Sequence, residues 1–592
     1  MTEYHNNMII DHSVEHRAFT IRCPMWANDM LQDVPGRRWS KGQKAWMVPV
    51  VRQGVEAMRR LSTMGGVQIT VAARKAIENY AIEREKQSTT ADGFPSWYKH
   101  KLEPRKHQTA ALNKAYPRRA FALFMDMQTG KTKTAIDLTA AHRMEGHLQA
   151  MFVLTKYTLR RNWIKQLGIH CPIPYDVMIP ETGKRREFDR WMIRPHDFKI
   201  MIAGWESLSA GAMHEMCMEF VRAFRCAVVG DETTYISNHK AIRSERSIDF
   251  GAEGAFVYAL TGTPILEGPM NLYAQFEFMD PEIIGIGDYY AFRNRYAVMG
   301  GYRPKEGPMA GKPLQIVGYQ NMDELTATVA PHCFQVMKTE AYDLPPKRYK
   351  TYTVELTKAQ REVYQQAKRE GLITHGGQEL VMKNVLEVAL RLHQITGGYT
   401  VKAGARRRMT RTKGEIEEVV YEPVEIIAPK DNPKMMELMD IVGGFKKKQG
   451  IIWAVYKPEI AAIVKMMRAA GLLVGELHGG IPEADRQPMV DAFQNGQLDW
   501  IVGNASTGGM GYTMMASEVN IFYNNTFKMI DRVQAEDRAY GDGQLKSGIW
   551  IDIVAEKTVD VAIIAALELK QDLATYVRER ITRASKILEG EA

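Results

Sequence analysis

The sequence predicts an α/β protein built on two parallel sheets, and two blocks of the chain carry this prediction. In residues 101–285 and again in 426–592, short apolar runs rich in β-branched and aromatic residues alternate with stretches of helical spacing. Strands buried on both faces read as nearly continuous apolar runs, and the helices between them cover the sheet. Each block therefore predicts one parallel-sheet lobe.

A small α+β domain is expected ahead of the first block, in residues 1–65. HRAFTIRC alternates apolar and polar residues as a strand does, and RRWSKGQKAWMVPV indicates two short strands around a Lys-Gly turn. GVEAMRRL then has helical spacing. Residues 66–100 are expected to form a helical linker, which begins with ARKAIENYAIEREK and ends in the polar segment QSTTADGFPSWYKHK.

The first block contains five expected strands: AFALFMD, AMFVLT, FKIMIAGW, CAVVGDE and FVYALTGT. Residues 286–425 are expected to be mostly helical protrusions and a crossing between the lobes, with LTKAQREVYQQAK and LVMKNVLEVALRLHQI as the clearest helices. The second block supplies the strands GIIWAVY, LLVGELHG, LDWIVGN, EVNIFYN and GIWIDIV. TVDVAIIAALELKQDLATYVRER is expected to close the chain as a helix.

Charge and composition limit the classes of function. The 592 residues carry a formal net charge of +9, which suits a polyanionic partner. Basic residues gather in 36–61, with seven Lys/Arg and one acid, and in 402–413, with six and none. No apolar run approaches the ~18 residues of a membrane span, the N-terminus lacks the features of a signal peptide, and no cysteine pair has CxxC spacing. We expect a cytoplasmic protein with no membrane partner and no zinc site built on cysteines.

The strongest local signal is MQTGKTKT, which follows the expected strand AFALFMD and opens a helical stretch. A phosphate-binding loop needs this strand–loop–helix context, in which N–H groups at the helix start hold phosphates. Lys131 is expected to reach the outer phosphates and the Thr132 hydroxyl to hold Mg²⁺, with Thr129, Gly130 and Lys133 completing the loop. The plainer interpretation, an ordinary exposed turn, is disfavoured by that context.

A pair of acids, Asp231 and Glu232, ends the apolar strand CAVV. In nucleotide-hydrolysing proteins the first carboxylate of such a pair holds Mg²⁺ and the second orients the attacking water. A solvated acidic turn is the alternative, and the β/α unit between this pair and the phosphate loop disfavours it. The stretch LTGTP, residues 260–264, follows the next expected strand as a coupling turn would.

Taken in order, these stretches resemble the motifs of Swi/Snf-type superfamily-2 helicases. The resemblance runs from about Leu102 to Ile581 and is collinear. The stretches that carry it are KHQ, MQTGKT, FVLTKYTLRRNWIKQL, GDETTYISNHKAIRSER, LTGTPILEGPMNLYAQFEFM, DLPPKRYKTYTVELTKAQREVY, ELHGGIPEADRQPMVDAF, STGGMGYTMMASEVNIFYNN, QAEDRAYGDGQ and TVDVAIIAALELK.

The resemblance implies two RecA-like lobes with helical insertions, ATP and Mg²⁺ bound between them, and DNA lying across both. Carried over by position, the resemblance implies that Gln108 recognises the adenine and that Lys131, Asp231 and Glu232 are catalytic. It also implies that Gln534 and Arg538 of the second lobe contact the nucleotide. It assigns DNA contact or coupling to Thr261, Thr263 and Gly509.

Three positions depart from the family pattern. Gln128 stands where the phosphate loop usually has glycine, and Thr234 where the family usually has histidine. Gly541, within QAEDRAYGDGQ, stands where an arginine finger is expected, and such fingers accelerate hydrolysis by ~10³–10⁵. Arg532 and Lys546 are the nearest cations that could replace it, and a slow or partner-activated ATPase is expected.

The stretch PGRRWSKGQKAWMVPVVRQGVEAMRRL resembles the HARP domain of annealing helicases, which implies binding to branched or forked DNA. Four cations are expected to pair with phosphates and Trp39 to stack on bases, whereas Trp46 leads an apolar run and is assigned mainly to the core. The cations are Arg37, Arg38, Lys41 and Lys44. A solvated charged face over two core tryptophans is the alternative. The run with Arg406 and Arg407 is either a DNA-facing loop or a solvated hairpin tip.

These expectations combine into a double-stranded DNA translocase acting on branched or forked DNA in replication, recombination or repair, by branch migration, fork remodelling or annealing. The compact chain is expected not to remodel nucleosomes and resembles members encoded by phage or other mobile elements, which would act at the nucleoid or in the host cytoplasm. The alternatives are a catalytically weakened DNA-binding scaffold, an RNA helicase, or the motor subunit of a defence or restriction complex with a protein partner.

Overall fold

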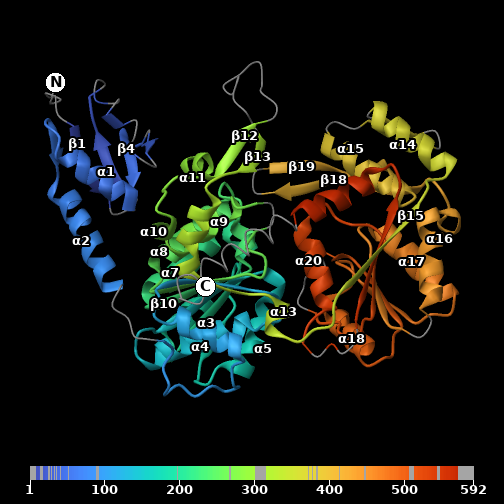
Figure 1. The fold of residues 1–592 in the computed structure, drawn as a ribbon, viewed down its shortest axis with the longest axis horizontal. Helices are drawn as coiled ribbons and strands as arrows, with labels where there is room; N and C mark the ends of the chain where they lie inside the picture. The colour runs from blue at the N-terminus through green and yellow to red at the C-terminus, as the bar shows by residue number, and fades with distance from the viewer. Residues whose placement is uncertain are drawn as a thin grey trace. The chain divides into compact units, whose positions relative to one another are not determined.

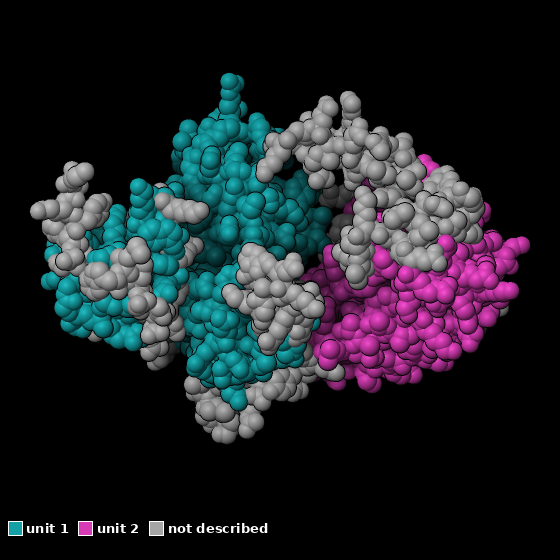
Figure 2. All heavy atoms as spheres, turned by 90° about the horizontal axis from the view of Figure 1, so that it is seen from above, with its two compact units in different colours: residues 1–337, 573–592 teal, residues 338–572 magenta. Residues whose placement is uncertain are grey.

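The computed structural model describes residues 8–570 apart from short gaps at 14–17, 25–26, 28–29, 32–33, 35–36, 41, 51, 88–92, 197, 266–267, 301–314, 371, 376–377, 382–384, 412–413, 446–447, 506–511, 543 and 545–546. The chain forms two compact units, residues 1–337 with 573–592 and residues 338–572 (Figure 2). Each unit contains one large parallel sheet, as expected for an α/β fold with two sheet-based lobes. No helix in the described part of the chain is long and apolar enough to cross a membrane.

The N-terminal domain is a five-stranded sheet with two helices. The expected strands β2 (Ala18–Arg22), β3 (Arg38–Ser40) and β4 (Ala45–Pro49) and helices α1 (Arg52–Ser62) and α2 (Val71–Gln87) are confirmed. Two further strands, β1 (Met8–Ser13) and β5 (Val67–Ile69), complete the order β3-β4-β2-β1-β5. β1 and β5 were missed because each has a short apolar stretch beside polar residues.

The sheet of unit 1, marked by β10 in Figure 1, has seven strands, all parallel, in the order β14-β6-β11-β10-β7-β9-β8. Its two edge strands are β14 (Cys333–Val336) and β8 (Asp176–Met178). The five expected strands are confirmed as β6 (Ala120–Met125), β7 (Ala150–Thr155), β9 (Lys199–Gly204), β10 (Cys226–Asp231) and β11 (Phe256–Leu260). Helices on both faces bury almost every strand residue. They are α3 (Lys106–Ala115), α4 (Lys131–Met144) and α5 (Arg160–His170), and α7 (Gly211–Ala223), α8 (Ile242–Glu253) and α9 (Asn271–Met279).

The segment 286–425 differs from the mostly helical expectation. It holds helices α11 (Tyr289–Tyr296), α12 (Met322–Val329), α14 (Lys358–Glu370) and α15 (Val385–Thr396), but also three antiparallel hairpins. The longest hairpin joins β18 (Tyr399–Arg411) to β19 (Gly414–Glu425), so residues 402–411 of the basic run lie on a strand, and 412–413 are outside the described residues. Two further strands, β14 (Cys333–Val336) and β15 (Arg348–Val354), form edges of the two large sheets.

The sheet of unit 2 has six parallel strands in the order β15-β24-β23-β20-β22-β21. The expected strands are β20 (Gly450–Trp453), β21 (Val474–Leu477), β22 (Trp500–Gly503), β23 (Val519–Phe522) and β24 (Ile549–Ala555). One core packs α16 (Pro433–Gly444) and α17 (Lys457–Ala469) on one face, and a second packs α18 (Glu483–Gln494) and α20 (Met529–Arg538) on the other. The closing helix is described over 559–570.

Candidate nucleotide-binding site

The order of strands in unit 1 gathers the predicted motifs at one edge of the sheet. The phosphate loop follows β6, the LTGTP turn follows β11, the acidic pair ends β10, and Thr155 ends β7. These four strands are consecutive neighbours and all parallel, so their carboxyl ends lie side by side. Ligands of open α/β sheets bind at this edge.

The phosphate loop is folded tightly onto itself and onto the glutamine of KHQ. The Lys131 ammonium donates to the Met125 carbonyl at 2.7 Å and the Asp126 carbonyl at 3.1 Å. Buried Gln108 donates from Nε2 to the Thr129 carbonyl at 3.0 Å. Gly130 has φ +93°, and a Cβ there would lie 2.1 Å from Gln108 Nε2. Both the backbone angle and the close approach therefore require glycine at 130, and the loop leads directly into the N-terminus of α4.

Gln128 adopts the left-handed backbone that the family's usual glycine would allow. Its φ is +67°, a region that costs a residue with a Cβ roughly 1–2 kcal/mol. The departure from glycine therefore places backbone strain in the phosphate loop.

Replacing Gln128 by glycine is expected to stabilise unit 1 by about 1 kcal/mol, because glycine adopts positive φ without steric cost. The measurement is the urea midpoint of unfolding at unchanged denaturant dependence. Gln128→Ala keeps the Cβ and is the matched control. An equal gain in both variants would show that the side chain, rather than the backbone angle, is the source of the strain.

Asp231 is a buried carboxylate held by two donors. Its Oδ2 accepts hydrogen bonds from the Thr155 hydroxyl at 2.9 Å and the Trp163 indole N–H at 2.8 Å, and its carbonyl accepts from the Trp205 indole at 2.7 Å. Burial raises the pKa of Asp231, while the Trp163 hydrogen bond and the charge of Lys131 oppose that rise. Trp163 belongs to the motif FVLTKYTLRRNWIKQL, but the sequence indicates no role for Thr155, Trp163 or Trp205, because their roles depend on which strands are neighbours.

Replacing Trp163 by phenylalanine is expected to destabilise unit 1 by about 1–3 kcal/mol, since it removes a donor from a buried carboxylate. Trp191→Phe is the matched control, because the Trp191 indole nitrogen is buried without a hydrogen-bond partner in the described part of the chain. Chemical denaturation of both variants gives the comparison. Equal losses would mean that packing, and not the hydrogen bond to Asp231, accounts for the effect.

Glu232 also has a left-handed backbone, with φ +54°, and connects the acidic pair to the LTGTP turn. The Thr261 hydroxyl lies 3.4 Å from Glu232 Oε2, and the Thr263 N–H donates to the Thr261 hydroxyl at 3.1 Å. A Cβ on Gly262 would lie 3.2 Å from the Met127 backbone nitrogen, so this turn packs directly on the phosphate loop. Thr261 is fully buried, so in this structure its side chain faces the acidic pair rather than solvent, and its coupling to DNA stays a prediction.

Gln275 on α9 is a connecting residue that the sequence reasoning missed. Its side chain is fully buried, accepts from the Thr233 hydroxyl at 2.7 Å and donates to the Pro264 carbonyl at 2.7 Å. It therefore fixes the residue after the acidic pair against the end of the LTGTP turn. A glutamine in the apolar run NLYAQFEFM was the available signal, because a buried amide needs polar partners.

Lys133 does not direct its ammonium toward the phosphate loop. It pairs with buried Asp137 at 2.5 Å, one turn further along α4. The same carboxylate accepts from the Tyr98 hydroxyl and lies 3.0 Å from the His100 ring. The expected phosphate contact is thus limited to the backbone N–H of Lys133, and its side chain instead ties α4 to the preceding segment.

In unit 2, α20 carries Gln534 and Arg538, and the Arg538 side chain is buried. Arg532, one of the two suggested replacements for the missing finger, is bound to Asp552 through two nitrogens and to Glu536 at 2.7 Å. These carboxylates raise its pKa further and hold its charge within unit 2, so Arg532 does not supply a free cation. Lys546, the other suggestion, lies outside the described residues.

Lys338 is a further cation beside this segment that the sequence reasoning did not find. Its buried ammonium donates to the Asp537 carboxylate at 2.9 Å and to the Tyr540 carbonyl at 2.7 Å. Since Tyr540 directly precedes Gly541, Lys338 fixes the backbone at the position where the arginine is absent. It lies about 200 residues away in sequence, so no local motif could have indicated it.

In the N-terminal domain, Trp39 was expected to be available for bases and Trp46 to belong mainly to the core, and the structure agrees in part. Trp39 is 51 % exposed, whereas Trp46 is partly buried against the domain core, and the two rings lie 5.5 Å apart. The Arg37 guanidinium lies 5.2 Å from the Trp46 ring, and Lys44 is exposed. Lys41 and Gly509 lie outside the described residues, as do the side chains of Arg38, Arg406 and Arg407.

The parallel sheets, the phosphate loop and the buried acidic pair beside it define a helicase-like P-loop protein. The chain belongs to the SNF2-related family: residues 45–398 match the SNF2-related domain, and residues 433–543 match the helicase conserved C-terminal domain.

Several curated proteins are similar over most of this chain. They include the ATP-dependent helicase fft1 of Schizosaccharomyces pombe, 18% identical over 79% of this chain and 52% of its own length, and a probable chromatin-remodeling complex ATPase chain of Oryza sativa, 22% identical over 79% and 40%. A SWI/SNF-related regulator of chromatin, subfamily A-like protein 1, of Xenopus tropicalis is 20% identical over 90% and 51%. The chain thus spans about half or less of the length of these relatives.

Among solved structures, the SWI2/SNF2 ATPase core of Sulfolobus solfataricus in complex with double-stranded DNA is similar at 18% identity and a TM-score of 0.36. The similarity covers 83% of this chain and 98% of that one.

Proposed function

We propose that this protein is a DNA-stimulated ATPase that moves along double-stranded DNA. The observation that carries the proposal is the buried acidic pair at the carboxyl edge of the unit 1 sheet, joined by Thr261 and Gly262 to the phosphate loop. A helicase named for its dependence on ATP and an ATPase core solved with double-stranded DNA are among the similar proteins.

ATP fits the residues of this edge. The helix N-terminus after Gly130 offers N–H groups for phosphates, Lys131 lies beside it, and Gln108 is fixed against the loop. Mg²⁺ fits the Thr132 hydroxyl and the Asp231 carboxylate, which are oxygen ligands of the kind this ion prefers. When bound, Mg²⁺ would offset the charge on the phosphate oxygens.

Within this proposal the acids have separate roles. Asp231 is oriented by Thr155 and Trp163, so its position is fixed before the ion arrives. Glu232 accepts the proton of the attacking water and holds that water in line with the outer phosphate. Because Glu232 contacts the Thr261 hydroxyl, a change in the position or protonation of Glu232 would be transmitted to the LTGTP turn.

The test is ATP hydrolysis by the purified chain with and without duplex DNA. Stimulation by duplex DNA that disappears in Lys131→Ala is the expected result. A rate no higher than that of Lys131→Ala under every condition would refute the ATPase and leave a DNA-binding scaffold. Stronger stimulation by duplex RNA than by duplex DNA would identify an RNA helicase instead.

We further propose that the N-terminal domain directs the protein to branched or forked DNA, as a HARP-like module acting in replication, recombination or repair. The exposed Trp39 offers an aromatic face for unpaired bases, and Arg37, over the neighbouring Trp46 ring, and the exposed Lys44 offer cations for phosphates. Trp39→Ala is expected to lower the preference for forked over linear DNA in a competition binding assay. Met64→Ala removes another exposed apolar side chain of this domain and serves as the control. Equal discrimination in both variants would reject the role of Trp39.

A further inference from the structure

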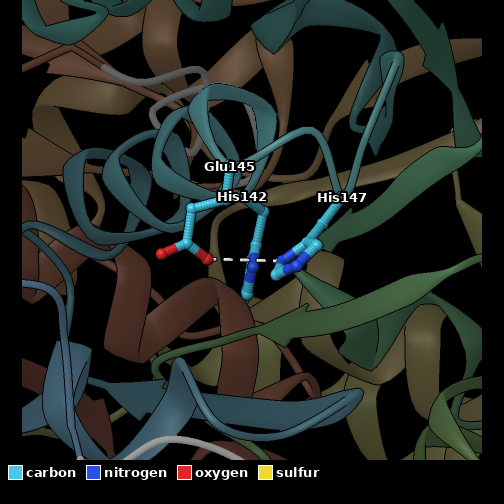
Figure 3. A group of neighbouring side chains, drawn as sticks. All are labelled: His142, Glu145 and His147. Atoms are coloured by element: carbon cyan, nitrogen blue, oxygen red, sulfur yellow. Dashed lines mark ion pairs between the residues drawn. The ribbon is translucent and has the colours of Figure 1, made fainter.

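Three potential metal ligands lie together at the carboxyl end of α4, away from the phosphate loop. His142 belongs to the last turn of the helix, Glu145 caps it, and His147 follows in the turn before β7. Their ligand atoms all lie within 4.8 Å of one another, and Figure 3 shows the three side chains converging. Because α4 has 14 residues, this group lies about 20 Å along the helix from Lys131.

His142 is held in one orientation by ring stacking. Its imidazole lies between the Tyr116 ring, at 4.2 Å and 3°, and the Phe256 ring, at 3.9 Å and 23°. The residue is only 2 % exposed, and neither ring nitrogen makes a hydrogen bond of good geometry within the described part of the chain. Buried polar atoms are normally hydrogen-bonded, so these two ring nitrogens are unusual and either could serve as a ligand atom.

Glu145 and His147 open this group to solvent. Glu145 Oε2 accepts from the Tyr116 hydroxyl at 2.5 Å and lies 3.3 Å from His147 Nδ1. Their side chains are 30% and 49% exposed, so an ion has a path to the buried His142. The Tyr116 hydroxyl gives the carboxylate the outer hydrogen bond that ligating carboxylates usually have.

We propose that His142, Glu145 and His147 form a Zn²⁺ site that fastens the turn between α4 and β7. Two imidazoles and one carboxylate form a ligand set that zinc uses, and it leaves a fourth position for water. A cation is also favourable there because the last carbonyls of a helix carry partial negative charge. The site is independent of the nucleotide site. The alternative is a core histidine beside a surface ion pair, and zinc titration distinguishes the two.

The experiment titrates ZnCl₂ into the full chain, freed of metal by chelation and without ATP, and follows binding by calorimetry. Glu145→Gln and His147→Ala change exposed side chains, so both variants should fold. His214→Ala removes a histidine paired with Asp249 elsewhere in unit 1 and is the matched control. Tyr116→Phe keeps the stacked ring but removes the hydroxyl, and it is expected to weaken binding about tenfold.

We expect the unaltered chain to bind one equivalent of Zn²⁺. Binding should be lost in Glu145→Gln and His147→Ala and should remain in His214→Ala. The thermal midpoint of unfolding should rise with Zn²⁺ only in the proteins that bind it. Absence of saturable binding to the unaltered chain would overturn the site, as would binding that persists in both ligand variants. Basal ATP hydrolysis should be similar in all of these proteins, which separates failure of this site from failure of the proposed ATPase.

Discussion

Glu232→Gln is expected to lower ATP hydrolysis by about 10²–10⁴-fold while ATP binding stays close to that of the unaltered chain. Glutamine has nearly the shape of glutamate and can keep the contact with the Thr261 hydroxyl, but it cannot accept the proton of the attacking water. Because the phosphate loop, Gln108 and Lys131 are untouched, the nucleotide should still be held. The variant should therefore accumulate as a complex with unhydrolysed ATP.

Single-turnover hydrolysis and nucleotide binding, measured separately, check this prediction. Glu277→Gln on α9 is the matched control, since burial raises the pKa of Glu277 to about 8 and its carboxyl is therefore largely neutral at pH 7. That control should hydrolyse ATP at close to the rate of the unaltered chain. Normal turnover by Glu232→Gln would remove Glu232 from the proposed chemistry and leave Asp231 or a partner to orient the water.

The central strands could be predicted from the sequence because they are buried on both faces. AFALFM and CAVVGD have no exposed residue, so the hydrophobic effect alone fixes their pattern. Edge strands carry a weaker signal, since one side meets solvent. β15, RYKTYTV, is exposed over most of its length and contains two cations, so its place in the unit 2 sheet depends on pairing with β24.

The residues of the candidate site also fall into those that the sequence could predict and those that depend on the fold. Lys131, Asp231 and Glu232 were predictable because each lies in a local motif next to a predicted strand. The roles of Trp163 and Gln275 were not predictable from the sequence. Trp163 donates to the buried Asp231 carboxylate and Gln275 to the Pro264 carbonyl only because the fold places their helices next to these acceptors. The family's usual glycine pointed to a left-handed backbone at Gln128, but a glutamine there left the angle open until the folded loop showed a φ of +67°.

Gly541→Arg is expected to accelerate DNA-stimulated hydrolysis by about 10- to 1,000-fold, below the ~10³–10⁵ attributed to native fingers because the surrounding loop has not adapted to the side chain. Two features of unit 2 support an increase. Arg532 is fully engaged by Asp552 and Glu536, and Lys338 is engaged by Asp537 and the Tyr540 carbonyl. Neither charge is therefore available for the nucleotide without breaking a buried contact.

Steady-state ATPase rates with saturating duplex DNA measure this effect, and Gly541→Ala is the control for adding a side chain without charge. Gly541 is buried, so the alanine variant also measures the effect of adding a side chain at this position. If arginine and alanine change the rate equally, the missing charge does not limit turnover, and another cation or a later step must be responsible. If arginine alone accelerates the reaction, the protein is a slowed motor that retains Gln534 and Arg538 but lacks one charge. The buried Lys338 contact would then serve to position this segment rather than to replace the finger.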